Sequence, residues 1–507
     1  MGHDLLGEAI LTWRTHSGDR CRTTLPGLLA LVGSGQLADF PRLRPHQFRP
    51  WLMFLTQLAA IALKRGERRD PPTDQDEWRT LLLALTNGDL APWSLVVTDL
   101  NRPAFFQPPV PEGTIDGWRT TSHPDDLDIL VTAKAHDVKA SLIPPDDLEA
   151  WVYALVTLQT MEGFLGQGNY GIARMNGGFG NRPYLGLAPD LQVASTFRRD
   201  VKILLSTWPT LIREHGYSER GAALLWLYEW DGRASFKRGD LSPHFIEVCR
   251  RVRFEATMTG VCCRRTSSTT RRALPDAKGG DVGDPWSPVK RLGDRARGSN
   301  GQASILTVGG RGFDYQLLSE LLLESAEYEA APASVPTRED GEQLVLSAWA
   351  LARGQGTTDG LHERSITVGG PARRWLQEPD TRQRLGRRAK AWIGIAEKMR
   401  AKVLFPALKR LAQQPPKDHF SARLDDVFFD RLFGSLEMPE DDVRMEFERL
   451  LRDIAWSELQ RAIDTCPTPQ GQRLRLVSEA EQLFNRCLRK HFSDIAGALD
   501  RSEGVTT

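Results

Sequence analysis

Apolar residues recur at helical spacing through much of the first half of the chain. The segment Pro50–Lys64, PWLMFLTQLAAIALK, is almost continuously apolar, too short to span a bilayer and interrupted by Gln57, which predicts a buried helix from about Pro50. A shorter helix is expected just before it, within TLPGLLALVGSG. Further helices are expected over about 145–165 and roughly 197–215, where apolar residues fall on one helical face.

Strand signals are fewer and shorter. The stretch WSLVVTDLNRPAFFQPP predicts a short strand followed by a segment broken by prolines. Mixed with the helices above, this pattern predicts a large mixed α/β domain over residues 1–365.

From about residue 375 the pattern is purely helical. Three apolar stripes step by three and four residues: Leu385, Ala389, Trp392, Ala396, Met399 and Val403; Val443, Phe447, Leu450 and Ile454; Leu476, Ala480, Leu483 and Cys487. A fourth helix is expected either around 340–353 or at 421–433. We therefore predict a four-helix bundle over residues 366–507 and an α+β fold class for the whole chain.

Composition and charge narrow the class of protein only a little. Hydrophobic residues make up 40% and charged residues 26%, as in globular proteins, and 66 Lys and Arg nearly cancel 65 Asp and Glu. The N-terminus has no basic start followed by an apolar run, so no signal peptide is expected. The six cysteines form no C-x-x-C pair, which argues against zinc and disulfides and favours the cytoplasm.

Local charge differs from the overall balance. Residues 250–311 hold thirteen Lys or Arg and five Asp or Glu, with many Ser, Thr and Gly residues. This composition predicts an exposed basic loop region, which would bind phosphates with salt-dependent affinity. A solvated charged surface is the alternative, and whether 263–285 orders only on binding stays open.

A glycine-dense stretch, GFLGQGNYGIARMNGGFGNRP, lies at 163–183. Gly166, Gly168 and Gly171 match G-x-G-x-x-G, but a helix precedes them and no helix follows at once, unlike a dinucleotide fingerprint. The nearby asparagines and the arginines Arg174 and Arg182 favour a loop that brings bare backbone against a ligand. A plain cluster of surface turns is the other interpretation.

Other chemical motifs are weak. KAHDVKA at 134–140 holds a His-Asp dyad without further metal ligands at suitable spacing, so a basic loop that meets phosphates is the alternative. No G-x-S-x-G and no Walker A motif occurs. We therefore expect no catalytic residues, no metal and no cofactor.

Several of these stretches together resemble a known family, the large subunit of the type I-E CRISPR surveillance complex Cascade (the CasA family). FFQ at 105–107 is similar to the family's P-F-x-Q, and the glycine loop follows a helix as it does in the family. DPWSPVKRLG at 284–293 resembles a segment of the form H-P-x-S-P followed by lysines. NGQASIL at 300–306, followed by FDYQ, resembles a stretch that ends in an Asn-Gln hairpin.

The resemblance implies binding of double-stranded DNA at the protospacer-adjacent motif, largely from the minor groove. It assigns motif contact to the glycine loop, with Lys290 as a lysine finger and Arg291 as a nearby substitute; the loop residues are Gly166, Gly168, Asn169, Tyr170 and Gly171. It assigns strand separation to a wedge at Gln316, next to Tyr315. Glycine backbone and one long cation suit a narrow groove, and pairing with the guide offsets the cost of opening.

The resemblance also implies a loop at about 130–141 that contacts the guide RNA and a neighbouring backbone subunit through Lys134, His136 and Lys139. The bundle would help to guide the displaced strand and contact the small subunits, and the complex would recruit a separate helicase-nuclease. The family's large subunit is not an enzyme and is not membrane-bound. This chain departs from the family in reading Asp-Tyr-Gln where the wedge is Phe-Asn-Gln, and in lacking the C-x-x-C pairs of some members.

Two further functions remain open from the sequence. One is a cytoplasmic nucleotide-binding enzyme that uses the glycine-rich loop at 166–171, and the other is a plain helical scaffold.

Overall fold

The computed structural model describes residues 3–128, 143–176, 181–277, 279–291, 303–323, 327–354, 357–411, 419–436, 438–465 and 470–496. It confirms an α+β fold. The chain divides into two compact units. Unit 1 comprises Met1–Phe313 and Ala326–Ser365, and unit 2 comprises Asp314–Ser325 and Ile366–Thr507. Residues 314–325, which the sequence pattern placed in the N-terminal part, thus belong to the helical unit.

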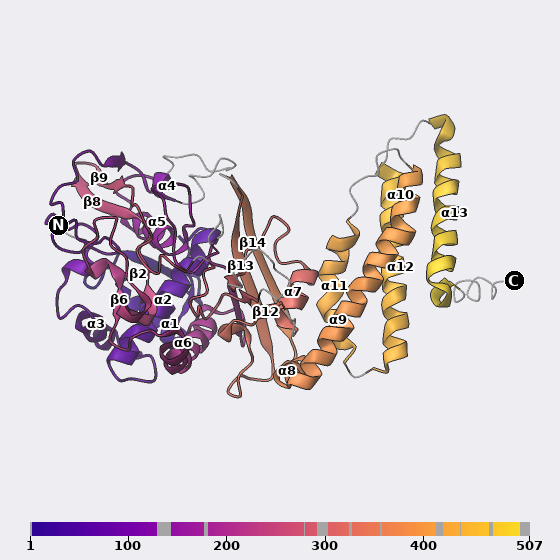
Figure 1. Ribbon diagram of the computed structural model, residues 1–507, viewed down its shortest axis with the longest axis horizontal. Helices are drawn as coiled ribbons and strands as arrows, with labels where there is room; N and C mark the ends of the chain where they lie inside the picture. Colours follow the sequence, from indigo (N-terminus) through magenta and orange to yellow (C-terminus); the bar gives the residue numbers. More distant parts are fainter. Residues whose placement is uncertain are drawn as a thin grey trace. The chain divides into compact units, whose positions relative to one another are not determined.

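The helices of unit 1 include one long apolar helix, α2 (Pro45–Arg65), around which others pack. They are α1 (Leu25–Ser34), α2, α3 (Gln75–Ala84), α4 (Pro124–Leu127), α5 (Leu148–Met161) and α6 (Val193–His215) (Figure 1). Helix α2 starts five residues before the predicted Pro50, at Pro45, since proline is tolerated in a helix's first turn; Pro50 lies inside the helix. Among the helices of the described residues, none has the length and hydropathy to cross a membrane.

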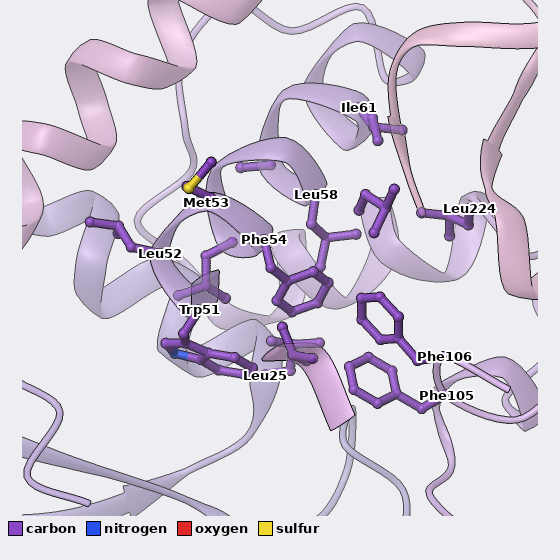
Figure 2. Packing of buried hydrophobic residues seen from close by; sticks show 14 of the residues in the cluster. Leu25, Trp51, Leu52, Met53, Phe54, Leu58, Ile61, Phe105, Phe106 and Leu224 are labelled. Atoms are coloured by element: carbon purple, nitrogen blue, oxygen red, sulfur yellow. The ribbon is translucent and has the colours of Figure 1, made fainter. Parts of the chain in front are cut away.

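The core of unit 1 lies against α2. From Trp51 to Leu63 every side chain of this helix is buried. The ring of Phe54 packs edge-on to Phe105 and Phe106, with centroids 5.8 and 5.2 Å away (Figure 2). Phe106 in turn stacks on Trp226, with centroids 4.6 Å apart. Each such aromatic side chain removes a large apolar area from water, so the cluster is a main source of stability.

Small sheets surround this core. The antiparallel sheet β2-β1-β3 joins Leu11–Thr15 (β1), Arg20–Thr23 (β2) and Leu37–Asp39 (β3). The antiparallel sheet β4-β9-β8 joins Arg119–Thr121 (β4), Arg251–Thr257 (β8) and Gly260–Thr266 (β9). Strands β6 (Ala222–Leu224) and β7 (Leu241–Ile246) are parallel.

Two further sheets contain the remaining strands. One has the order β14-β13-β5, with strands Thr357–Val368, Leu344–Gly354 and Tyr184–Ala188. The other has the order β11-β10-β12, with strands Ser304–Ile305, Val289–Lys290 and Tyr328–Glu329. The helix considered around 340–353 is therefore wrong, because β13 occupies this segment and pairs with β5 from Val345 to Trp349.

The strand predicted in WSLVVTDLN does not form. Ser94 forms only an isolated bridge with Asp4, and part of the remaining backbone bonds side chains: Gln107 Nε2 donates to the Leu95 carbonyl at 2.8 Å, and Arg253 donates to the carbonyls of Val97 and Asp99 at 2.8 and 2.9 Å. Gln107 also accepts the backbone N–H of Phe254 at 2.7 Å. Buried backbone groups must be paired, and here two side chains replace a neighbouring strand.

The described residues of unit 2 form a bundle of four long helical segments with two short α-helices. The first segment runs from α9 (Pro379–Met399) through a π-helical stretch, Arg400–Leu404, into α10 (Phe405–Leu411). The others are α11 (Phe420–Gly434), α12 (Glu440–Thr465) and α13 (Arg473–His491), and the short ones are α7 (Tyr315–Leu322) and α8 (Gly370–Gln377) (Figure 1). The fourth bundle helix is thus the one expected at 421–433.

The predicted stripe of α9 and the π-helical stretch faces the bundle core, whereas the other two are only partly buried. All six residues from Leu385 to Val403 are buried, and Trp392 stacks on Phe447 with ring centroids 3.9 Å apart. In α13 the buried positions are Ala480, Phe484 and Leu488, so its inward face is rotated from the predicted one.

Candidate nucleic-acid interface

The glycine-rich loop follows α5 and closes on itself. The N–H of Leu165 donates to the Asn169 carbonyl at 3.0 Å, and the N–H of Asn169 donates to the Gly166 carbonyl at 3.0 Å. Gly166 and Gly168 have φ of 103° and 84°, a region that favours glycine. Leu165, Gln167 and Asn169 are the exposed side chains of this turn.

Two of the loop glycines are needed for packing inside the protein. A Cβ on Gly168 would lie 2.9 Å from the Cβ of Ser267, and one on Gly171 would lie 2.5 Å from the carbonyl carbon of Gly163. The backbone N–H of Ser268 donates to the Gly168 carbonyl at 3.0 Å, which joins the loop to the end of β9. The glycine density therefore has a structural reason, while contact of the loop with DNA stays a prediction.

Arginine side chains hold the base of this loop. Arg250 donates to the carbonyl oxygens of Gly163, at 2.8 Å, and Tyr170. Arg174 pairs with Glu247 at 2.6 Å, and Glu247 also accepts the N–H of Ala173 at 2.7 Å. Arginine with its five donors can bond several carbonyl or carboxylate oxygens at once, so it fixes an irregular segment well.

Arg174 and a second arginine, Arg182, connect the loop with the segment that leads to Lys290. Asp284 lies 2.6 Å from Arg182 Nε and 3.3 Å from Arg174 Nε, with all three side chains buried. Burial lowers the pKa of Arg182 to about 10, although Asp284 acts in the opposite direction, so its charge is kept at neutral pH. Arg174 and Arg182, whose presence favoured ligand contact, are thus internal supports of the loop.

The side chains of Lys290 and Arg291 are exposed, on and just after β10, the central strand of the sheet β11-β10-β12. Lys290, on β10, is 3.4 Å from Glu327, and its Nζ lies 5.5 Å from the ring centroid of Tyr328. Arg291 pairs with Glu329 at 2.8 Å. Exposed ion pairs of this kind contribute little, about 0–1 kcal/mol, so either cation could exchange its carboxylate for a phosphate at small cost.

The residues assigned to the wedge lie on α7 in unit 2. Tyr315 is buried and packs on Phe428 with ring centroids 4.9 Å apart, and burial raises its pKa to about 12. Gln316 is half-buried and donates to Glu397 at 3.2 Å. Of the two side chains, only that of Gln316 is partly accessible without unpacking, and its role as a wedge stays a prediction.

The predicted guide-RNA residues Lys134, His136 and Lys139 lie outside the described residues, but the stem of their segment is described. Its two ends meet where the N–H of Ile143 donates to Asp125 at 2.9 Å. Asp128 accepts from His46 at 2.8 Å and from Gln47 at 2.7 Å. Buried carboxylates with several donors make a firm base for this segment.

The exposed basic loop predicted for 250–311 is wrong over most of its first half. Residues 251–266 form the β8–β9 hairpin, and five of the arginines between 250 and 272 are buried: Arg250, Arg251, Arg253, Arg271 and Arg272. Most of them donate to backbone carbonyls or pair with a carboxylate, as Arg251 does with Glu112 at 2.7 Å. The hairpin could have been found from the alternation in RVRFEAT and GVCCRRT around the turn MTG.

The geometry offers no support for the dinucleotide or metal alternatives. The loop lies between α5 and the strand β5, whereas a dinucleotide fingerprint needs a strand before it and a helix after it. Within the described ranges no three His, Cys, Asp or Glu residues gather as a metal site. The His-Asp dyad of KAHDVKA falls outside those ranges.

No protein-family model matches the chain, and no curated protein matches it either. Solved structures do. Cse1 from Acidimicrobium ferrooxidans superposes with a TM-score of 0.65 over 98% of this chain and 99% of its own, at 16% identity. CasA (Cse1) from Thermus thermophilus gives 0.64 over 96% and 100%, at 14% identity. This chain has the Cse1 fold.

The likeness extends to a chain from a solved CRISPR RNA-guided surveillance complex, with a TM-score of 0.60 over 95% of this chain and 99% of that chain, at 14% identity. The expectation of a CasA-like fold, made from weak motifs in order along the chain, is therefore confirmed. The Cse1 fold covers both units, so the glycine loop, Lys290 and α7 all lie within the matched length.

Proposed function

We propose that this chain is the non-catalytic large subunit of a type I-E CRISPR RNA-guided Cascade complex. It recognises the protospacer-adjacent motif in double-stranded DNA, helps to open the duplex and contributes to recruitment of the helicase-nuclease. The observation that carries the proposal is the whole-length Cse1 fold, shared with a chain from an RNA-guided surveillance complex.

The glycine loop supports motif contact in this proposal. Its exposed turn presents Gln167 and Asn169 on a backbone that is held from beneath by Arg250. The minor groove displays few distinguishing donors and acceptors, so a pre-formed turn with amide side chains suits it better than a helix does. A turn fixed before binding loses less conformational entropy when it meets DNA.

Lys290 supplies the long cation of this interface. Its side chain projects from the central strand β10, with its ammonium over the ring of Tyr328, and exchanges Glu327 for the DNA. Gln316, with Glu397 as its partner in the free protein, inserts beside the first base pair and contributes to strand separation. Base pairing with the guide then offsets the opening cost, since the two duplexes are nearly equal in stability.

The test is a binding measurement with the assembled complex. The full chain is combined with the backbone subunits and guide RNA encoded beside it, and retention of duplex DNA is measured for a library of flanking sequences. Retention that depends on the flank and disappears when this chain is left out supports the proposal. Retention that is the same for all flanks, or unchanged without this chain, contradicts it.

The nucleotide-binding enzyme predicts a different result in the same preparation. That alternative would be favoured if the isolated chain bound ATP or NAD and if the complex retained the same amount of DNA with and without this chain.

A further inference from the structure

Two arginines face each other across the sheet β4-β9-β8. Arg119 of β4 and Arg265 of β9 are directly opposite partners in the antiparallel register, next to the pair Thr120 and Arg264. Directly opposite residues of an antiparallel pair place their side chains on the same face. Two cations in such a position repel one another and destabilise the sheet unless an anion lies near them.

The surrounding arginines show that this pair is unusual. Seven arginines lie between residues 250 and 272, and six of them have a hydrogen-bonded partner within the protein: Arg250, Arg251, Arg253, Arg264, Arg271 and Arg272. Among the described residues, the side chains of Arg265, which is half-buried, and Arg119, which is exposed, have no hydrogen bond or ion pair, although their backbones pair in the sheet. The fold thus leaves two guanidinium groups unmatched at one place.

The surroundings of Arg265 disfavour the charged form of its guanidinium group. Its side chain is half-buried, and burial, followed by the charge of Arg119, lowers its pKa. The charges of Asp126 and Glu162 act in the opposite direction. An anion bound between the guanidinium groups would relieve both the desolvation and the repulsion.

Both strands of the pair lead to segments already assigned to nucleic acid. Strand β4 runs into α4 and then into residues 129–142, which hold Lys134, His136 and Lys139. Strand β9 runs into Ser268, whose N–H is bonded to Gly168 of the glycine loop. Figure 1 shows β8, β9, α4 and α5 in the same part of unit 1. We expect a nucleic-acid strand that contacts either segment to pass near this sheet.

We propose that Arg119 and Arg265 form a binding site for one backbone phosphodiester of a nucleic acid. A phosphate matches the planar fork of guanidinium groups, which can bond its oxygens in pairs, and it brings the negative charge that this pair lacks. The choice of nucleic acid rests on the proposed function, whereas the anion site rests on the register of the two arginines and on their lack of side-chain partners among the described residues.

The anion site is tested first on the free full chain with inorganic phosphate as the probe. The melting temperature is measured in phosphate and in chloride at equal ionic strength, for the parent, for R119Q/R265Q and for R213Q/R220Q, which removes two exposed arginines elsewhere in unit 1. Phosphate should raise the melting temperature of the parent and of R213Q/R220Q more than that of R119Q/R265Q. Equal shifts in all three proteins would overturn the site.

The source of the phosphate is tested in the assembled complex. Affinity is measured against salt concentration for duplex DNA, and separately for the 5′ segment of the guide RNA. Loss of one phosphate contact should lower the salt slope by about 1 and weaken binding roughly tenfold for R119Q/R265Q, on one of the two probes. The probe for which the salt slope of R119Q/R265Q falls identifies the nucleic acid that is bound. If the salt slopes of R119Q/R265Q equal those of R213Q/R220Q on both probes, the nucleic-acid assignment is rejected. A parent complex that ignores the flanking motif would instead contradict the proposed function.

Discussion

The backbone N–H of Ser268 donates a hydrogen bond of 3.0 Å to the carbonyl oxygen of Gly168, and the Cβ atom of Ser267 lies in the space where Gly168 lacks one. The residues just after β9 and the glycine loop are therefore packed and hydrogen-bonded to each other. The position of the loop depends on the hairpin, although more than ninety residues separate the two in the sequence.

Gly168→Ala should destabilise the protein by about 1–3 kcal/mol, because it combines a positive φ with a close approach to Ser267. Gly166→Ala has a positive φ but no atom within 4 Å of the new Cβ, so it should cost only about 1 kcal/mol. Urea unfolding measures both. Adding Ser267→Gly to Gly168→Ala should recover part of the loss; no recovery would show that the overlap is not the cause.

Asn169→Ala should leave stability within about 0.5 kcal/mol of the parent, since the side chain is exposed. Motif-dependent DNA retention should fall, by about 1 kcal/mol of binding free energy or more if the amide bonds a base edge. Asn101→Ala, an exposed asparagine of another loop, is the comparison for gel-shift titrations. If both variants bind as the parent does, Asn169 does not read the motif.

Lys290→Ala and Glu327→Gln should change DNA affinity in opposite directions. The lysine variant loses a cation and should reduce the salt slope by about 1, whereas the glutamine variant removes a competing carboxylate and should tighten binding. Neither should alter stability by more than about 1 kcal/mol, as the pair is exposed. Weaker binding by Glu327→Gln would mean that the carboxylate positions the lysine for DNA.

Asp200 should give the unfolding free energy a distinct pH dependence. Burial raises its pKa to about 6, although Trp286 and Arg199 act in the opposite direction, while an unfolded aspartate titrates near 3.8. The folded state therefore binds an extra proton between about pH 4 and 6, and this group adds stability as the pH falls. Between pH 7.5 and pH 5 the gain is about 1–2 kcal/mol.

Buried His244 acts in the opposite direction. Its pKa is lowered to about 3 by burial, so the unfolded state binds the extra proton below pH 6.5 and stability is lost there. Asp200→Asn leaves this loss uncompensated, and its stability should fall more steeply than that of the parent from pH 7.5 to pH 5. Parallel curves from urea titrations at several pH values would contradict the assignment to Asp200.

The sequence indicated the fold where one period dominated. The bundle stripes from Leu385 to Val403 step regularly and are buried as predicted, and α2 is buried along its apolar run. The fourth bundle helix was ambiguous, because the LVLSAWALARG of β13 is apolar on both faces of its strand, and a short apolar run does not distinguish the two periods.

The residues of the candidate site stay predictions, but the structure shows which of their features the sequence could indicate. Gly166 and Gly168 were recognised as a special turn, and their positive φ values agree with this. The basic composition was misleading because the sequence does not show which arginines bond to groups inside the fold. Arg250 and Arg182 add positive charge to the count, but Arg250 donates to a backbone carbonyl and Arg182 pairs with the buried Asp284. The partners Glu247 and Asp284 are distant in sequence from the loop that they support.

Helix α7 precedes β13 and β14 in the chain, yet Tyr315 takes its contacts from Asp425 and Phe428 of α11. A fragment that ends at Ser365 would carry α7 with its apolar side bare, and a fragment that starts at Ile366 would expose the ring of Phe428. The helical bundle is therefore not a continuous segment that can be removed by itself. An exchange of this bundle between relatives has to include both Asp314–Ser325 and Ile366–Thr507. Otherwise one chimera keeps α7 without its packing partner, and the other lacks the helix that covers Phe428.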